Sequence, residues 1–134
     1  MDMTEEEVQS LIAVANEARR WAYAPYSNFP VGAALRTKSG RIFTGVNVEC
    51  AAYPNGTCAE RVAIYKAVSE GEREFEVIAV VTPTGGSPCG GCRQMLAEFG
   101  LDTIVLIADG NENLLQETTV GELLPSAFQP KHLT

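Results

Sequence analysis

The sequence lacks several features that would assign it to whole classes of protein. No apolar stretch approaches the ~20 residues that a membrane-spanning helix needs, so we expect no membrane partner. The opening MDMTEEEVQS is acidic and has no basic start followed by an apolar run. No secretory signal is therefore visible, and we expect a cytoplasmic protein.

Basic residues are few, with 10 Lys and Arg against 17 Asp and Glu for a net charge of −7. Because nucleic-acid binding depends on clustered Lys and Arg, this balance argues against a nucleic-acid partner and favours a small neutral or cationic substrate.

The chain also lacks internal repeats, low-complexity tracts and any linker long enough to divide it. Its 134 residues therefore predict one domain, residues 1–134. An apolar content of 46% with 20% charged residues is typical of a soluble globular protein. Cysteine is scarce, with four residues. In a chain without a visible export signal, cysteines indicate metal binding or catalysis before disulfides.

Hydrophobic periodicity and turn residues predict strands that alternate with helices. The expected helices cover residues 4–23, 57–71 and 89–100, with a further short helix that starts at 119 and is broken by Pro125, and the expected strands cover residues 31–37, 41–48, 75–82, 103–109 and 114–119. Thr4 and Glu7 have the spacing of a capping box, and so do Thr119 and Glu122. This order predicts the α/β class with a single sheet of about five strands.

The stretch NGTCAERVAIYKA, residues 55–67, places a cysteine and two charged residues at the start of a predicted helix. Thr57 is the expected N-cap and Gly71 the expected stop. Cys58, Glu60 and Arg61 then fall in the first turn, where the backbone presents positive potential. A helix N-terminus lowers the pKa of a thiol, so this cysteine is placed to act as a thiolate.

The motif CAE is followed about thirty residues later by PCGGC, which also precedes a predicted helix. Three thiolates from two helix ends, Cys58, Cys89 and Cys92, satisfy one Zn²⁺ and leave the fourth tetrahedral position for water. Glu60 lies beside them and is suited to hold and move a proton. A three-cysteine zinc site with a nearby glutamate that is not a ligand is the pattern of zinc-dependent nucleobase deaminases.

Two other interpretations of the cysteines remain open. Cys89 and Cys92 have the C-x-x-C spacing of a thioredoxin-like redox pair, although that interpretation leaves CAE unexplained. Alternatively, Cys50 completes a closed Cys₄ site in a zinc module without catalytic activity. Cys50 lies outside any C-x₂₋₄-C spacing with Cys58, so we expect it to be a small buried or half-buried filler.

Six motifs in this order, VGAAL, NVE, AAY, CAERVA, PCGGCRQ and ELLPSAF, resemble the small, homotetrameric cytidine deaminases. The resemblance implies a three-layer α/β/α fold with a five-stranded mixed sheet. It also implies zinc-dependent hydrolysis of cytidine and 2′-deoxycytidine to uridine and 2′-deoxyuridine, with release of ammonia, in pyrimidine salvage. A deaminase of another aminopyrimidine, such as blasticidin S, is the alternative, but the arginine after CAE favours cytidine deaminase.

The resemblance also implies roles for individual residues. Cys58, Cys89 and Cys92 match the zinc ligands, Glu60 the proton shuttle and Arg61 an arginine that bonds to ligand cysteines. The substrate-binding residues that it implies are Phe29, Asn47, Glu49, Tyr53, Ala59 and Phe128. Asn47 and Glu49 match the pair that binds the ribose hydroxyls, and Phe29 the ring that packs against the pyrimidine.

Two of these implications leave questions that the sequence does not answer. Phe128 matches an aromatic supplied by a neighbouring subunit of a homotetramer, although a C-terminal Phe more commonly packs onto its own core. Cys50 stands where the family often has asparagine, beside Glu49, and this departure leaves the preference between ribose and deoxyribose open.

Overall fold

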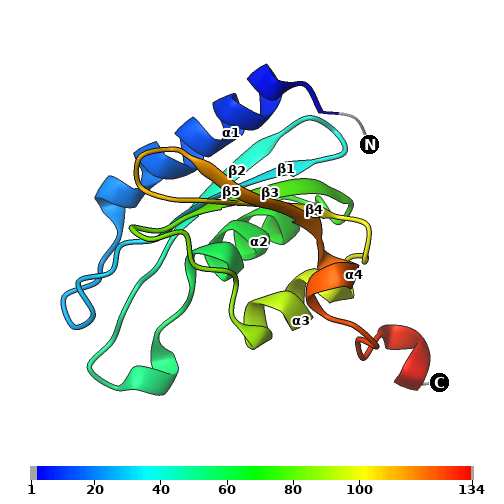
Figure 1. Cartoon of the computed structure of the whole chain (residues 1–134). Helices are drawn as coiled ribbons and strands as arrows, with labels where there is room; N and C mark the ends of the chain where they lie inside the picture. The colour runs from blue at the N-terminus through cyan, green and yellow to red at the C-terminus, as the bar shows by residue number, and fades with distance from the viewer. Residues whose placement is uncertain (1–2, 134) are drawn as a thin grey trace.

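The computed structural model describes residues 3–133, and its elements follow the predicted alternation (Figure 1). The helices are α1 (Glu5–Ala18), α2 (Ala59–Ser69), α3 (Gly90–Glu98) and α4 (Val120–Leu123), and the strands are β1 (Gly32–Thr37), β2 (Ile42–Val46), β3 (Phe75–Val81), β4 (Ile104–Ala108) and β5 (Leu114–Thr119). Short 3₁₀ turns cover Arg19–Trp21, Tyr53–Asn55 and Pro130–Leu133. Within the described residues, no helix is both long and apolar enough to cross a membrane.

The five strands form one mixed sheet in the order β2-β1-β3-β4-β5. β3 and β4 are parallel, and every other neighbouring pair is antiparallel. Because β1 is antiparallel to both β2 and β3, those two strands run in the same direction. The C-terminal ends of β2 and β3 therefore lie on the same side of the sheet, and the helices that follow them, α2 and α3, both begin there.

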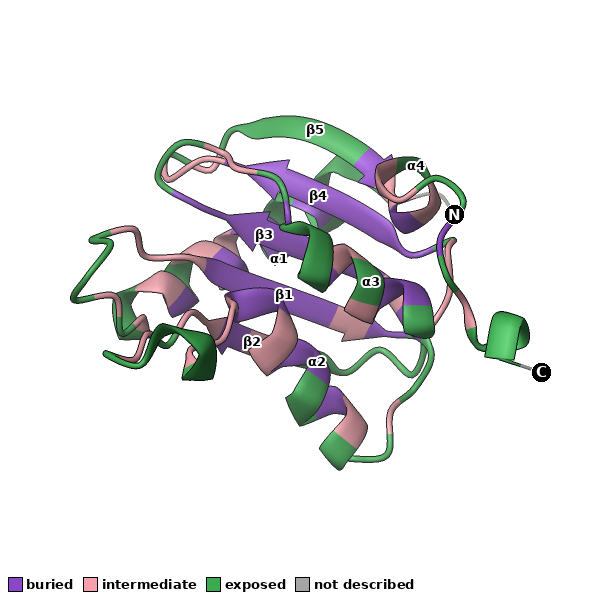
Figure 2. Ribbon diagram, turned by 90° about the horizontal axis from the view of Figure 1, so that it is seen from below, coloured by how far each residue is buried: buried purple, intermediate pink, exposed green. Residues whose placement is uncertain are grey.

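The sheet is covered on both faces, which confirms the three-layer α/β/α prediction (Figure 1). Successive strand residues point to opposite faces. Ala34, Val77 and Leu106 pack with the apolar face of α1, whereas Leu35 and Ile78 pack with α2 and α3. Figure 2 shows β1, β3 and β4 buried along most of their length, while β5 at the edge is mainly exposed.

The helix ends follow local rules, with two corrections to the predictions. The Thr4 hydroxyl accepts from the Glu7 N–H, and the Glu7 carboxylate accepts from the Thr4 N–H, which confirms the first predicted capping box. At α4 the Thr119 hydroxyl accepts from the Glu122 N–H, but the Glu122 carboxylate accepts from the Thr119 hydroxyl and not from the Thr119 N–H, so only half of the second predicted capping box forms.

At α2 the predicted N-cap, Thr57, is wrong: Cys58 occupies that position without a side-chain capping bond. Thr57 instead exchanges backbone hydrogen bonds with Val48, at 2.9 and 3.0 Å. This pairing ends one residue before the helix begins and leaves the Cys58 sulfur available for other contacts.

Two strand glycines allow the helices to pack unusually close to the sheet. A Cβ atom on Gly32 would lie 2.0 Å from the Ala15 carbonyl oxygen of α1. A Cβ atom on Gly45 would lie 2.1 Å from the Ala59 carbonyl oxygen and 2.6 Å from the Ala63 nitrogen of α2. Glycine is therefore required at Gly45 for the first turn of α2 to rest on the sheet.

Candidate metal centre and adjoining cavity

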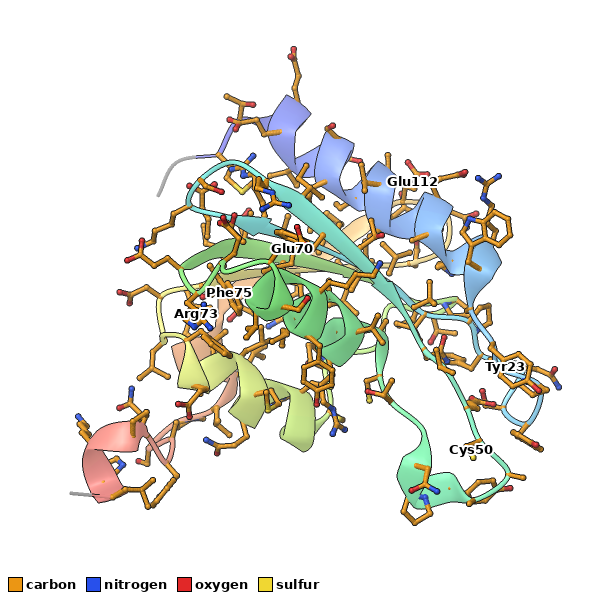
Figure 3. All side chains as sticks on the ribbon, turned by 180° about the vertical axis from the view of Figure 1, so that it is seen from behind. Tyr23, Cys50, Glu70, Arg73, Phe75 and Glu112 are labelled. Carbon is orange, nitrogen blue, oxygen red and sulfur yellow. The ribbon has the colours of Figure 1, made fainter. Side chains whose placement is uncertain are left out.

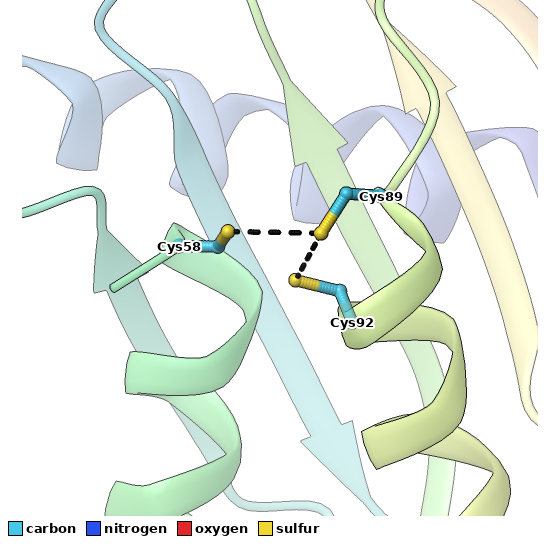
Figure 4. Close-up of side chains that lie close together, drawn as sticks. All are labelled: Cys58, Cys89 and Cys92. Carbon is cyan, nitrogen blue, oxygen red and sulfur yellow. Dashed lines mark hydrogen bonds between the residues drawn. The ribbon is translucent and has the colours of Figure 1, made fainter. Parts of the chain in front are cut away.

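Three cysteines meet where the N-termini of α2 and α3 converge (Figure 4). Cys58 is the N-cap of α2, Cys89 is the N-cap of α3, and Cys92 lies in the first turn of α3. The Cys58 and Cys89 sulfurs are 3.9 Å apart, and the Cys89 and Cys92 sulfurs are 3.5 Å apart. All three sulfurs lie within 4.8 Å of one another. The sequence prediction that these side chains converge is thus confirmed.

The sulfur spacing fits a tetrahedral metal site. With Zn–S bonds of about 2.3 Å, the edge between two sulfurs of a regular tetrahedron is about 3.8 Å. The two measured distances bracket this value. Three sulfurs occupy three corners, so the fourth corner remains for a non-protein ligand, as in catalytic zinc sites. Cys92 is buried, Cys58 is half-buried and Cys89 is exposed, so the site is reached from one side.

The surroundings of Cys58 favour the thiolate form that a metal requires. The pKa of Cys58 is lowered to about 5, chiefly by a hydrogen bond from Cys92 and further by Arg61. Hydrogen bonding to Cys58, together with burial, raises the pKa of Cys92, which therefore retains its proton in that pair. The Arg61 guanidinium lies one helical turn after Cys58, and its Nη2 is 3.7 Å from the Cys58 sulfur. Hydrogen bonding to Cys58 and Cys92 raises the pKa of Arg61, which thus remains a cation against the cluster.

Glu60 lies beside this cluster but is not a member of it. Its side chain is only 4% exposed, yet it lines a cavity that adjoins the cysteines. Burial raises the pKa of the Glu60 carboxyl, because a low-dielectric environment disfavours the charged form. A carboxyl group with a raised pKa is suited to exchange a proton near neutral pH.

The cavity has a volume of about 530 Å³. Six of the predicted site residues line it: Asn47, Glu49, Tyr53, Cys58, Ala59 and Glu60. Phe29 and Phe128 do not line the cavity of their own chain. Ala59 is fully buried, and Tyr53 is 74% exposed, with its ring edge-on to the Tyr26 ring at 6.1 Å between centroids.

The Asn47 side chain forms hydrogen bonds with the backbone of the segment that carries Phe29. Its Oδ1 accepts from the Val31 N–H at 2.9 Å, and its Nδ2 donates to the Phe29 carbonyl at 3.0 Å. From the end of α1, Arg19 Nε donates to the Pro30 carbonyl at 3.0 Å. An asparagine amide can form four hydrogen bonds, so two positions remain on the side chain that lines the cavity.

The Glu49 carboxylate accepts hydrogen bonds from the backbone of the turn before that segment, at residues 26 and 27. One carboxylate oxygen accepts from the Tyr26 and Ser27 N–H groups at 3.0 and 3.1 Å, and the other accepts from the Ser27 hydroxyl. These bonds, with that from the Ser27 hydroxyl foremost, lower the pKa of Glu49. Sequence reasoning missed these backbone roles of Asn47 and Glu49, because their partners lie 16 to 23 residues away.

Cys50 and Phe128, whose roles the sequence left open, both lie outside the cysteine cluster. Cys50 lies in the loop between β2 and α2 (Figure 3), half-buried, and lines the cavity without joining the three sulfurs. The Phe128 ring is 55% exposed and packs against His132 at 5.5 Å, so the alternative that it folds onto its own core is wrong. Its neighbours Leu123, Leu124 and Ala127 do pack on the core.

An α/β/α sandwich with three thiolates at two helix N-termini, and a buried glutamate beside them, defines the class of zinc-dependent deaminases. Comparison with known proteins narrows this class. Residues 5–108 match the family model of the cytidine and deoxycytidylate deaminase zinc-binding region. The chain therefore belongs to that family, and zinc is its metal cofactor.

Individual relatives agree with the family match. The chain is 48% identical over 130 residues to a cytidine deaminase of Sporosarcina psychrophila, covering 96% of each chain. It is 51% identical over 124 residues to one from Halalkalibacterium halodurans, covering 90% of this chain and 92% of the relative. Its fold matches the crystal structure of cytidine deaminase from Burkholderia pseudomallei with a TM-score of 0.86 and 46% identity, covering 94% of this chain and 100% of the other.

Proposed function

We propose that the protein catalyses the hydrolytic deamination of cytidine and 2′-deoxycytidine to uridine and 2′-deoxyuridine, with release of ammonia. The observation that carries this proposal is the buried Glu60 on the wall of a cavity that adjoins the three-cysteine cluster. A reaction of this kind serves pyrimidine salvage, and we place it in the cytoplasm.

Cys58, Cys89 and Cys92 would hold the zinc ion, one per subunit. When bound, the metal supplies Lewis acidity that lowers the pKa of a water molecule at its open position. Glu60 would carry the protons: its carboxylate takes one proton from the attacking water and donates it to N3 of the pyrimidine, which makes C4 electrophilic as the water oxygen adds to it. Glu60 then takes the second proton from the added hydroxyl group and delivers it to the amino group, which leaves as ammonia while the C4 carbonyl forms. General acid–base catalysis of this kind contributes typically about 10²–10⁴-fold to a rate.

The other cavity residues bind and orient the nucleoside. The free hydrogen-bonding positions of Asn47 and Glu49 receive the sugar hydroxyls. Phe29, which is outside the set of residues that line the cavity, is the ring that packs against the pyrimidine in this proposal. Ala59 and Tyr53 also line the cavity. Arg61 offsets the negative charge of the thiolates, which otherwise weakens zinc as a Lewis acid.

The test is loss of ultraviolet absorbance when purified protein is incubated with cytidine, with zinc measured on the same sample. Glu60→Gln should retain about one zinc per chain and lose nearly all turnover, because the amide cannot exchange the proton. Glu70→Gln, on the exposed end of the same helix, is the matched control and should remain active. Zinc loss in a folded Glu60→Gln protein would make Glu60 a ligand instead of a shuttle.

We also propose a homotetramer in which Phe128 completes the cavity of a neighbouring subunit. The exposed Phe128 ring and its absence from the cavity of its own chain support this arrangement. Chains with Glu60→Gln and chains with Phe128→Ala, each weakly active alone, are mixed and reassembled. Some mixed sites then pair an intact Glu60 with an intact neighbouring Phe128, so activity should exceed the average of the parents. Activity at that average, or a monomeric mass in solution, refutes the proposal.

A further inference from the structure

We infer that Arg93 is a positioning residue that fixes the loop carrying Cys89 and the C-terminal segment carrying Phe128 in one arrangement. The inference rests on the proposed function, which gives zinc to Cys89 and a neighbouring cavity to Phe128. Arg93 itself is not among the residues that line the cavity and is not a member of the cysteine cluster.

The guanidinium of Arg93 donates hydrogen bonds to two segments far apart in the chain. Its Nε donates to the Pro88 carbonyl at 2.8 Å, and its Nη2 donates to the Ser87 hydroxyl at 2.8 Å. Its Nη1 donates to the Leu123 carbonyl at 2.7 Å, across 30 residues of sequence. All three distances are at the short end of the normal range, so each nitrogen of the fork has a well-formed bond.

The first two bonds act on the loop that carries the metal ligand. Pro88 directly precedes Cys89, so a fixed Pro88 carbonyl fixes the backbone from which the Cys89 sulfur extends. The beginning of the same loop is held by the Thr82 hydroxyl, which accepts from the Gly85 and Gly86 N–H groups at 2.7 Å each. Arg93 supplies the corresponding restraint at the end nearer the metal centre.

The third bond acts on the C-terminal segment. Leu123 ends α4, and the following Leu124 and Ala127 pack on the core, while Phe128 points outward. The residue after Arg93, Gln94, donates from Nε2 to the Phe128 carbonyl at 2.7 Å. Two consecutive residues of α3 therefore hold the beginning and the end of the segment that presents Phe128, and only Arg93 also holds the metal loop.

An arginine suits this position for a geometric reason. A guanidinium presents five N–H donors in a rigid plane, whereas an ammonium group is a single point on a flexible stem. A lysine at position 93 keeps the charge but cannot reach the three acceptors together. The charge-preserving substitution Arg93→Lys therefore separates the geometric role from a general effect of charge.

The test compares zinc release from the loaded protein into excess chromophoric chelator. Arg93→Gln should release zinc about tenfold faster than the unmodified protein, the lower end of the range for residues that orient metal ligands. Arg93→Lys should also release it faster. Arg20→Gln, which removes an arginine from an exposed ion pair with Glu17, is the control and should leave the rate unchanged.

Two further measurements separate positioning from simple loss of stability. With Co²⁺ in place of zinc, Arg93→Gln should shift the visible absorption bands that report ligand geometry, while the circular dichroism spectrum stays the same. Gln94→Ala, which frees only the Phe128 end, should raise KM for cytidine without changing zinc release. Arg93→Gln should change both.

An unchanged release rate and an unchanged cobalt spectrum in folded Arg93→Gln and Arg93→Lys overturn the inference. If Arg93→Gln does not fold, Arg93→Lys together with Ser87→Ala, which removes one of the three acceptors, decides the question by the same two measurements. Absence of cytidine turnover in the unmodified protein refutes the proposed function instead. In that case zinc release still tests the role of Arg93 at the metal loop.

Discussion

Replacing Asn47 tests whether its side chain supports the cavity wall, contacts the sugar, or does both. In the structure the amide joins the Phe29 carbonyl and the Val31 N–H, on either side of Pro30. Asn47→Ala removes both bonds and leaves two partly buried backbone groups without their partners. The segment that carries the Phe29 ring then loses its connection to the end of β2.

The magnitude follows from the two lost bonds. A buried polar group left unsatisfied costs about 1–3 kcal/mol, and the half-buried position admits some water, which favours the lower end. Two such groups give a loss of about 2 kcal/mol in the free energy of unfolding. At roughly 4 °C per kcal/mol for a chain of this length, Tm should fall by about 8 °C. Asn47→Asp keeps an acceptor for the Val31 N–H but places a carboxylate against the Phe29 carbonyl. The Asn47→Asp protein should therefore be no more stable than the Asn47→Ala protein.

The assay is thermal unfolding at fixed protein and zinc concentrations, followed by kinetics on two substrates. Asn55→Ala, at an exposed asparagine in the loop beside the cavity, is the control and should change Tm little. Loss of the support lowers kcat/KM for cytidine and for 2′,3′-dideoxycytidine alike, and loss of a sugar contact adds a further decrease for cytidine alone. We expect both effects. An unchanged Tm in Asn47→Ala would refute the structural part of this reasoning.

Three further outcomes are expected. Cys50→Ser should keep zinc and activity by metal analysis and assay, whereas Cys92→Ser should lose both; zinc loss in Cys50→Ser would favour the closed Cys₄ site. Arg61→Ala should keep its fold but bind zinc less tightly and turn over slowly, and full activity would show that the helix N-termini suffice. Gly45→Ala should destabilise the protein by about 3 kcal/mol and weaken zinc binding, because the new methyl group displaces the first turn of α2. Normal stability and zinc content in that variant would contradict the close approach.

The metal centre was predictable from the sequence because its signals are local. Each cysteine motif stands at the start of a helix, and helix starts are recognisable from a few neighbouring residues. Thr57 shows the limit of this reasoning. It is a good capping residue by type, but pairing with Val48, nine residues earlier, shifted the cap to Cys58.

The cavity wall was predictable only through family resemblance, because its geometry depends on distant contacts. Nothing near Asn47 or Glu49 in the sequence indicates that their side chains bind the backbone of residues 26–31. The same holds for Arg93, whose bond to Leu123 spans 30 residues. From the neighbouring sequence alone, Gly45 is expected to weaken its strand. Only the position of α2 shows why a side chain is excluded there.

Charge explains why the cysteines occupy these particular positions of the fold. Three thiolates around Zn²⁺ leave a formal charge of −1, which opposes the Lewis acidity that deamination needs. The sheet topology brings two helix N-termini to one edge, and each contributes roughly half a positive charge. Arg61 adds a full positive charge next to Cys58, and its Nε is buried without a hydrogen-bond partner. Such burial is unfavourable for a cation unless an anion lies close by, so Arg61 is better suited to the charged, metal-binding cluster than to a neutral redox pair.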